Sequence, residues 1–370
     1  MNYTIAEINL KNLQYNYNSI RKKTKTKVMA VVKADAYGHG MVKCTEALLK
    51  LKNKPEYFGV ALLSEAIELR KSTNIKSPIV CFAPFHKELF KEYIKYNVIL
   101  SVTSEDQANE LLKLKTKKKI IVHFNINTGM NRLGIRFSNA VKVIEKFAND
   151  KKIVIDGIYT HFATSDEKSK DFANLQLKRF ASLIEELRDK NINYGLAHAA
   201  NSGAILDMEN SYFDMVRPGI SLYGYTPSQE TTESIKLKPV MSLYSKLSAI
   251  TKVNKGETVG YGRLYKASKE IRCGTIPAGY ADGLSRGLSD KMKVIINNKV
   301  FPQIGRISMD RISINLASTK IKKGSKVILI GSSKNHKIDA WEWSKILNTI
   351  PYEITCLISK RVARKYVGNS

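Results

Sequence analysis

Residues 28–40 read Val28-Met-Ala-Val-Val-Lys33-Ala-Asp-Ala-Tyr37-Gly-His-Gly40, a short apolar run that ends at a lysine and two closely spaced glycines. Seven more apolar, β-branched runs follow, with helix-like segments between them. The eight runs are 28–32, 57–61, 78–82, 98–102, 120–124, 153–159, 195–199 and 214–220. Strands that alternate with helices in this way predict an α/β fold, a parallel (β/α)₈ barrel of the TIM type. A doubly wound open sheet is the alternative, but no early strand is followed by Gly-x-Gly-x-x-Gly.

The pattern changes after Tyr225. Residues 226–238 are polar and suit a linker. Short alternating runs then follow at 241–250, 271–277, 293–296, 312–316 and 326–330, and a helix is expected at about 341–348. We therefore expect a barrel domain over residues 1–232 and a smaller, mostly antiparallel β domain over 233–370. The first ten or so residues are expected to pack with the second domain.

The charge of the chain is strongly positive, with 61 Lys and Arg against 33 Asp and Glu, a formal net charge of +28. A nucleic-acid binder would fit this balance. The excess is spread along the whole chain, however, and the densest runs, 21–27 and 113–119, lack the interleaved aromatics of a single-strand binding surface. A solvated lysine-rich surface is the favoured interpretation, with no nucleic-acid partner.

Other classes of protein are not favoured. No stretch approaches about 18 consecutive apolar residues, so no membrane span is expected. The first ten residues lack the pattern of a signal peptide, which favours a cytoplasmic location. The four cysteines lie far apart, without Cys-x-x-Cys, so neither a disulfide scaffold nor a metal site is expected.

Candidate site residues gather at the ends of the predicted barrel strands, where the active sites of such barrels lie. They are Lys33, Arg132, His161, Ser202 and Arg217. A lysine at a strand end among apolar neighbours is a candidate for Schiff-base chemistry. Taken singly, His161 could be a core residue and Ser202 a helix N-cap. Five such residues on one rim favour an active site.

Several motifs resemble those of the alanine racemase family, and they occur in order over essentially the whole chain. In the barrel they are residues 31–40 around Lys33, Thr128-Gly-Met-Asn-Arg132-Leu-Gly, Thr160-His161-Phe-Ala-Thr, Ala199-Ala-Asn201-Ser202 and Val216-Arg217-Pro-Gly219-Ile. The β domain adds Val259-Gly-Tyr261-Gly, Gly279-Tyr280-Ala-Asp282-Gly-Leu, Gly305-Arg-Ile-Ser-Met309-Asp310 and Tyr352-Glu. The resemblance implies a pyridoxal-phosphate enzyme that interconverts L- and D-alanine and supplies D-alanine for peptidoglycan.

The resemblance also implies a role for each motif residue. Lys33 carries the cofactor and acts as one base, while Tyr261 of the partner subunit acts as the other. His161 is the neighbour that tunes this tyrosine, and it is held by Arg217, which faces the pyridine nitrogen. The phosphate is held by Tyr37, Ser202, Tyr352 and the backbone at Gly203, Gly219 and Ile220. The substrate is positioned by Arg132, Met309, Tyr280 and Asp310, with Met309 coming from the partner subunit. A homodimer with shared active sites follows.

The chain departs from the family at a few positions. Many members have a lysine, often carbamylated, where this chain has Asn125, and an aspartate where it has Asn127. Arg132 therefore lacks a charged partner, which a bound anion such as chloride, received by Arg132 and the Asn125 amide, could replace. Ser308 stands where a cysteine often precedes the methionine, and we expect little effect.

Three other functions remain as alternatives. A racemase of the same family with a broader substrate range is one, although such relatives are typically exported. A non-enzymatic pyridoxal-phosphate-binding barrel of the homeostasis type is another, but such proteins lack the C-terminal β domain. A basic nucleic-acid binder is the weakest, and salt-sensitive binding would support it.

Overall fold

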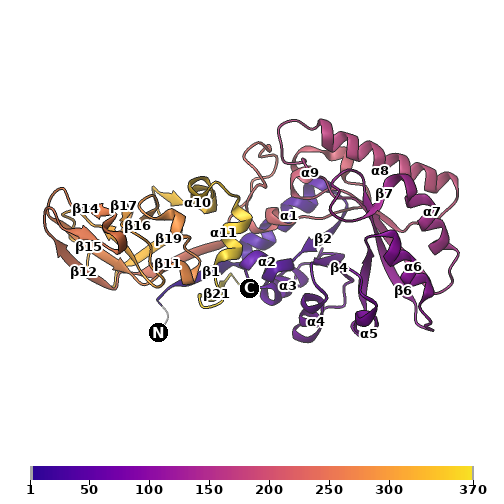
Figure 1. Ribbon diagram of the computed structural model, residues 1–370, viewed down its shortest axis with the longest axis horizontal. Helices are drawn as coiled ribbons and strands as arrows, with labels where there is room; N and C mark the ends of the chain where they lie inside the picture. Colours follow the sequence, from indigo (N-terminus) through magenta and orange to yellow (C-terminus); the bar gives the residue numbers. More distant parts are fainter. Residues whose placement is uncertain (1–2, 369–370) are drawn as a thin grey trace. The chain divides into compact units, whose positions relative to one another are not determined.

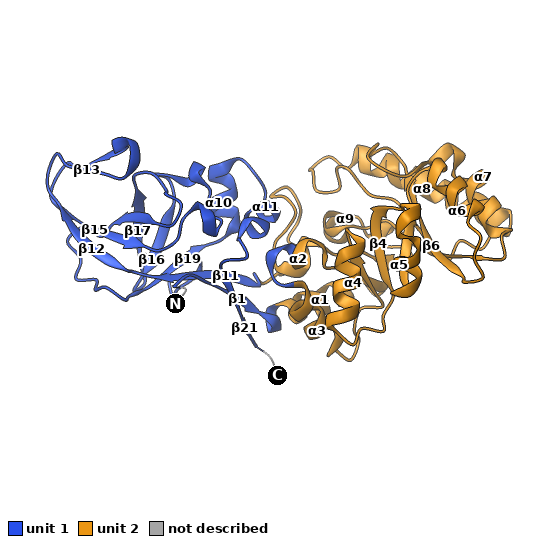
Figure 2. Ribbon diagram, turned by 60° about the horizontal axis from the view of Figure 1, so that its bottom comes forward, with its two compact units in different colours: residues 1–12, 37–40, 239–370 blue, residues 13–36, 41–238 orange. Residues whose placement is uncertain are grey.

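The computed structural model describes residues 3–368, which fall into two compact units (Figure 2). The barrel unit consists of residues 13–36 and 41–238. The sheet unit consists of the chain before Leu13, residues 37–40 and the chain from Pro239 onward. No helix in residues 3–368 is both long enough and apolar enough to cross a membrane.

The barrel unit is built on eight parallel strands within the described residues, in the order β10-β2-β3-β4-β5-β6-β8-β9. They are β2 (Lys27–Val31), β3 (Tyr57–Val60), β4 (Ile79–Pro84), β5 (Val98–Val102), β6 (Ile120–Asn127), β8 (Ile153–Tyr159), β9 (Leu196–His198) and β10 (Met215–Val216). Two backbone hydrogen bonds join β9 to β10, Asp214 N to Ala197 O at 3.0 Å and Arg217 N to Ala200 O at 2.8 Å. The sheet therefore closes on itself, which confirms the predicted barrel.

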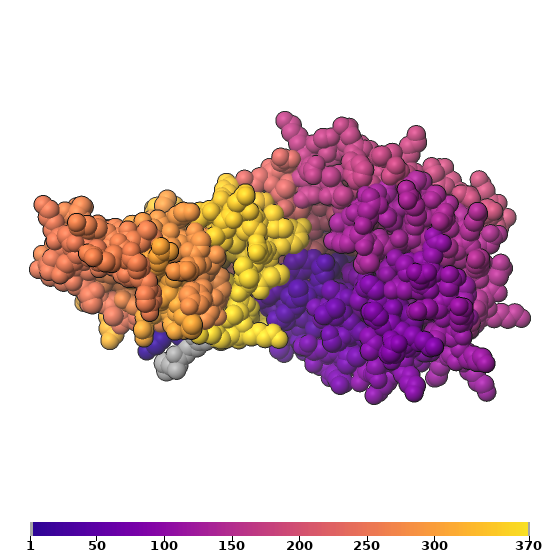
Figure 3. All heavy atoms as spheres, in the orientation of Figure 1, coloured from indigo at the N-terminus to yellow at the C-terminus, as the bar shows by residue number. Residues whose placement is uncertain are grey.

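Helices surround these strands (Figure 1). They are α1 (Leu10–Thr24), α3 (Met41–Leu49), α4 (Leu63–Ser72), α5 (Phe90–Lys95), α6 (Glu105–Lys113), α7 (Phe137–Ala148), α8 (Asp171–Asp189) and α9 (Ser202–Asp207). Helix α7 shows why they pack, because its apolar face buries Ile144 and Phe147, and the Phe147 ring meets that of Phe124 edge-on at 4.9 Å. In the space-filling view this unit presents a closely packed outer surface on the face shown (Figure 3).

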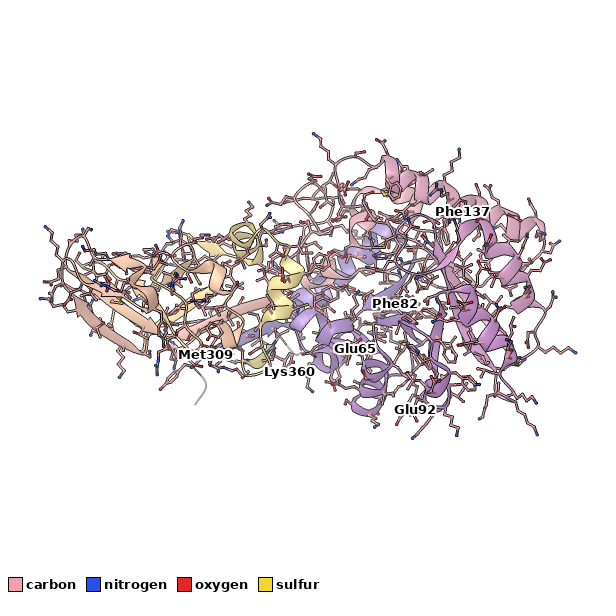
Figure 4. All side chains as sticks on the ribbon, in the orientation of Figure 1. Glu65, Phe82, Glu92, Phe137, Met309 and Lys360 are labelled. Carbon is pink, nitrogen blue, oxygen red and sulfur yellow. The ribbon has the colours of Figure 1, made fainter. Side chains whose placement is uncertain are left out.

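A left-handed helical turn, α2 (Lys33–Gly38), follows the first barrel strand. Its residues Ala34 to Tyr37 have φ values between 52° and 55°. Left-handed helical backbone costs an L-residue roughly 1–2 kcal/mol. Glu65 of α4, labelled in Figure 4, stabilises the start of the turn, because its carboxylate accepts from Ala34 N at 2.7 Å and from Ala61 N at 2.8 Å. The chain direction after Lys33 is thus set by a strained turn and one carboxylate.

The sheet unit contains a long sheet in the order β12-β15-β18-β17-β16-β19-β11-β1-β21. These strands are β12 (Ala249–Val253), β15 (Ile271–Ile276), β18 (Ile312–Asn315), β17 (Lys299–Ile304), β16 (Lys293–Ile296), β19 (Lys326–Ser332), β11 (Met241–Lys246), β1 (Ile5–Asn9) and β21 (Ala363–Val367). Strand β1 pairs antiparallel with β11 and parallel with β21. Helices α10 (Ala340–Leu347) and α11 (Pro351–Leu357) follow the sheet. The expected mostly antiparallel β fold is confirmed.

In an ordinary right-handed helix, replacing an exposed alanine by glycine lowers the stability. In the left-handed turn we expect the opposite at Ala34, whose side chain is exposed. We expect Ala34→Gly to leave the free energy of unfolding unchanged or raise it by up to about 1 kcal/mol, because glycine adopts positive φ without steric cost. Ala34→Val should lower it by about 1 kcal/mol or more. Urea unfolding monitored by circular dichroism measures both. A glycine variant less stable than the valine variant would contradict the left-handed geometry.

Candidate active site

The barrel places the predicted residues at the carboxyl ends of its strands. Lys33 follows β2, Arg132 lies after β6, and His161 lies after β8. Ser202 begins α9 after β9, and Arg217 directly follows β10. Burial and the nearby charges of Arg217, Arg132 and Lys33 lower the pKa of His161 to about 3. His161 is therefore a neutral imidazole among cations at neutral pH.

Arg217 is almost fully buried at this rim. Its Nη1 donates to His198 Nδ1 at 2.9 Å and to His198 O at 2.8 Å. Its Nη2 donates to Thr160 O at 2.6 Å and Ala199 O at 3.0 Å, with His161 Nδ1 at 3.4 Å. Burial lowers the pKa of Arg217 to about 10, so it stays charged at neutral pH. In the described part of the chain its Nε–H has no acceptor, which leaves one donor for a ligand.

A second cluster of donors lies where α9 meets the 3₁₀ turn η3 (Ile220–Tyr223). The hydroxyl of Ser202 accepts from Gly219 N at 3.0 Å and from Ser221 N at 3.3 Å. This holds the starts of both helical segments together. Their first-turn amides at Gly203 and Ile220 have no helical acceptor, and such amides favour an anion. No carboxylate contributes to this cluster within the described residues, so it suits a phosphate.

The loop that carries Arg132 folds back onto the end of β6. Gly134, at φ +113°, donates its N–H to Thr103 O at 2.7 Å. A Cβ at Gly134 would lie 3.0 Å from Asn125 Oδ1, so the loop passes close to that amide. Asn127 Oδ1 supports the loop by accepting from Asn131 N at 3.1 Å. Arg132 is exposed and has no ion-pair partner among residues 3–368.

The sheet unit carries the other predicted residues around an open hollow of about 790 Å³. Its lining comprises Tyr261, Tyr280, Arg286, Ile307, Ser308, Met309 and Asp310. The side chain of Tyr261 is 72% exposed, that of Tyr280 45% and that of Met309, labelled in Figure 4, 52%. Large apolar side chains this exposed, grouped around one hollow, indicate a binding surface.

Two loops of the sheet unit are tied together beneath this hollow. Tyr280 N donates to Ser308 O and Ala281 N to Met309 O, both at 3.0 Å. A Cβ at Gly279 would overlap those two carbonyls, so the close approach requires glycine there. The contact fixes Tyr280 and Met309 next to each other.

Asp310 is held by an ion pair. Arg361 Nη2 lies 2.7 Å from Asp310 Oδ1, and Arg361 Nε lies 2.8 Å from Asp282 Oδ1. The Asp282 carboxylate also accepts from Gly279 N at 2.9 Å. Asp310 therefore lines the hollow and is held in place by Arg361, which also pairs with Asp282.

Tyr37 and Tyr352 both belong to the sheet unit, although Tyr37 is only four residues from Lys33. Their ring centroids lie 5.8 Å apart. Burial raises the pKa of Tyr37, so its phenol stays protonated and can donate a hydrogen bond. The two residues predicted to share the phosphate are thus neighbours.

Sequence reasoning missed three residues that shape these surfaces, namely Glu65, Arg286 and Arg361. Glu65 lay inside a predicted helix, and its place in the first turn was the available signal, since an acidic side chain there often accepts backbone N–H groups. Arg286 and Arg361 gave no sequence signal, because each acts through contacts that only the folded sheet unit creates.

Comparison with known proteins places this geometry in a family. Residues 8–227 match the family model described as alanine racemase, N-terminal domain, and residues 240–366 match alanine racemase, C-terminal domain. The chain belongs to the alanine racemase family. It is 41% identical to alanine racemase 1 of Clostridium acetobutylicum, over 98% of this chain and 95% of that one. It is also 41% identical to alanine racemase of Treponema denticola, over all of both chains.

Solved structures agree with this assignment. Alanine racemase of Clostridium difficile 630 superposes with a TM-score of 0.92 at 37% identity, covering 99% of this chain and 96% of that one. Alanine racemase of Streptomyces lavendulae gives 0.93 at 29% identity, covering 100% and 98%. The expected family, fold class and racemase activity are confirmed, and the activity of the family is the interconversion of L- and D-alanine.

Alanine racemases use pyridoxal phosphate, and the barrel residues fit that group. The free Nε–H of buried Arg217 suits an aromatic nitrogen that accepts a hydrogen bond. The amides joined by Ser202 suit the phosphate. Lys33 stands on the same barrel rim.

Two buried histidines beside Arg217 predict acid sensitivity. Burial lowers the pKa of both His123 and His198 in the folded protein. The unfolded chain therefore binds protons below about pH 6.5 that the folded chain does not, so the free energy of unfolding should fall as pH drops from 7 to 5. Each histidine contributes up to about 1.4 kcal/mol per pH unit. Urea unfolding at several pH values measures this slope.

The matched variants for that experiment are His198→Gln and His86→Gln, the latter at an exposed histidine. The first should reduce the slope of the pH dependence by the contribution of one buried histidine, because His123 and His161 remain, and the second should leave the slope as in the wild type. Equal slopes in all three proteins would show that the buried imidazoles do not cause the acid sensitivity.

Proposed function

We propose that Lys33 and Tyr261 of the partner subunit are the two opposed bases that interconvert L- and D-alanine. The observation that carries this proposal is the cationic rim of Lys33, Arg132 and Arg217 around a neutral His161. A rim of this kind attracts an amino-acid carboxylate and a phosphate, and its neutral imidazole can accept a hydrogen bond from a neighbouring group. The product D-alanine then serves peptidoglycan synthesis, and we propose that the protein acts in the cytoplasm.

The barrel residues bind and orient the cofactor. Bound pyridoxal phosphate, held by Lys33, would draw electrons from Cα of alanine and acidify its proton. Arg217 donates its Nε–H toward the ring nitrogen without giving up the proton, because its pKa stays near 10. Ser202 and the amides at Gly203, Gly219 and Ile220 hold the phosphate, together with Tyr37 and Tyr352.

Proton transfer needs one base on each face of Cα, because removal and return on a single face would restore the same enantiomer. The Lys33 amine serves the D-alanine face. The phenol of the partner subunit's Tyr261 serves the L-alanine face, and the neighbouring His161 tunes it by hydrogen bonding. Arg132 holds the alanine carboxylate together with the backbone at the partner's Met309, while Tyr280 and Asp310 line the approach.

The proposed domain division follows from these roles. Residues 1–232 form the cofactor-binding domain, and residues 233–370 supply the second base across a homodimer, with the first ten residues in the β domain. The 72% exposure of Tyr261 supports the dimer, since a base must be removed from water to act efficiently.

The Lys33→Ala variant should abolish racemisation of L-alanine, and Tyr261→Phe should lower turnover on the order of 10²- to 10⁴-fold because it removes one proton-transfer group. Both enantiomers are followed by chiral chromatography with purified, cofactor-loaded protein. A panel of L-serine, L-lysine and L-arginine is tested alongside.

The matched control is Tyr265→Phe, a tyrosine of the same unit whose hydroxyl contacts Asn315 Nδ2 at 3.3 Å. It should retain wild-type turnover. Full activity in Lys33→Ala would refute the proposed mechanism, and comparable turnover of basic amino acids would identify a broad-spectrum racemase instead.

We further propose that an anion such as chloride binds between Arg132 and the Asn125 amide. Replacing chloride by gluconate should raise the KM for alanine severalfold, because Arg132 then lacks a negative partner. Asn125→Asp, which supplies a fixed charge, should remove the dependence on chloride. Identical KM values in both salts for the wild type would rule out the anion.

A further inference from the structure

A continuous line of hydrogen bonds leads from Arg217 into the interior of the barrel. Arg217 Nη1 meets His198 Nδ1 at 2.9 Å, and His198 Nε2 meets His123 Nδ1 at 3.0 Å. His123 Nε2 meets Asp156 Oδ2 at 2.9 Å, and that oxygen also accepts from the Tyr57 hydroxyl at 3.0 Å. We call these the buried imidazole line. Its members, Arg217, His198, His123 and Asp156, come from β6, β8 and β9 and from the residue that follows β10, while Tyr57 of β3 lies beside its end.

The direction of every hydrogen bond in the line is fixed by its two ends. Arg217 can only donate, so His198 Nδ1 must accept and its Nε2 must carry the proton. His123 Nδ1 then accepts, and its Nε2–H donates to the Asp156 carboxylate, which can only accept. Both imidazoles are therefore neutral Nε2–H tautomers. A proton added to either would set two donors against each other.

The surroundings of the line support neutral imidazoles. Both histidine side chains are fully buried, and burial lowers their pKa values. The Tyr159 ring stacks on His198 at 5.1 Å, with an interplanar angle of 16°, and the Arg217 guanidinium lies 5.3 Å from the centre of the same ring. Stacking on one side and hydrogen bonds at both nitrogens leave His198 a single orientation.

Among residues 3–368, no carboxylate forms a hydrogen bond or an ion pair with Arg217. Its acceptors are three backbone carbonyls and two imidazole nitrogens, all of them neutral. A buried cation without a countercharge is costly. Asp156 is the negative charge connected to it, through two imidazoles whose N–H dipoles are aligned by the line.

We propose that Asp156 is a positioning residue for Arg217: through His123 and His198 it fixes the tautomer that holds the guanidinium in place. The inference rests on the proposed role of Arg217 toward the cofactor ring. If the line is broken, Arg217 turns or loses its partner at Nη1, and its Nε–H no longer points at a constant position. The chemical step should then suffer more than alanine binding.

The test is ¹⁵N NMR of histidine-labelled protein, without and with pyridoxal phosphate, combined with steady-state kinetics. In the wild type, His123 and His198 should both show Nε2–H tautomers. In the Asp156→Asn variant the amide can offer an N–H to His123 Nε2, which moves the protons of His123 and His198 to Nδ1. Nδ1–H signals should then appear for both residues, and the His198 Nδ1–H, set against Arg217 Nη1, breaks the contact that holds the guanidinium. The kcat of this variant should fall about 10- to 100-fold with little change in KM.

Three further variants separate the explanations. Tyr57→Phe removes a hydrogen bond to the same carboxylate oxygen without breaking the line, and its kcat should stay within about threefold of the wild type. Asp156→Glu keeps the charge and should retain the wild-type tautomers, which covers the case in which Asp156→Asn does not fold. Arg217→Lys tests the role of Arg217 itself and should lose activity.

The outcomes are distinct. Unchanged histidine tautomers and kcat in Asp156→Asn, with Arg217→Lys inactive, overturn the role of Asp156 and leave the proposed function standing. An equal loss of kcat in Tyr57→Phe with unchanged tautomers indicates mere structural damage and also overturns it. Full activity in Arg217→Lys overturns the proposed role of Arg217 and the inference with it.

Discussion

Burial of the Arg217 cation is the constraint on which the barrel rim depends. A guanidinium that loses its water must find acceptors for its N–H groups, and here three come from the backbone of Thr160, His198 and Ala199. Those carbonyls lie within reach only because β8, β9 and β10 end side by side in a closed barrel. Burial, and after it the charge of Arg217, lowers the pKa of His161 and keeps that imidazole neutral. Closure of the barrel is therefore what allows the buried charge of Arg217 to exist at the rim.

The predicted site residues of the two units are made rigid by different means. On the barrel side, Lys33 leaves its strand through a left-handed turn whose first amide is fixed by Glu65. On the sheet side, Tyr280 and Met309 are locked by backbone contacts that exclude a side chain at Gly279. Both devices restrict backbone rather than side-chain freedom, so the functional groups are positioned before any ligand arrives.

Patterns that depend on local composition were predictable, and those that depend on distant contacts were not. The barrel strands follow apolar β-branched runs, and 293–296 coincides with β16. The predicted run 241–250 proved to be two strands, because Leu247 and Ser248 turn the chain toward different partners, Ser325 and Thr275. The turn at Lys33 has no signature, since Ala-Asp-Ala-Tyr also suits an ordinary helix. Five rim residues were predicted from their places at strand ends and the other motif residues by resemblance. His123 and Asp156 were not predicted, because they meet only when β6 and β8 pair.

The buried imidazole line has a consequence for how the chain can change over evolutionary time. Each member fixes the proton position of the next, so exchanging one alone sets donor against donor or leaves an acceptor empty. Positions 123, 156, 198 and 217 are therefore expected to covary among relatives, as a block that is retained or replaced together. Single substitutions should be tolerated on the lysine-rich surface, but a single substitution within the buried imidazole line leaves at least one of its hydrogen bonds unmatched.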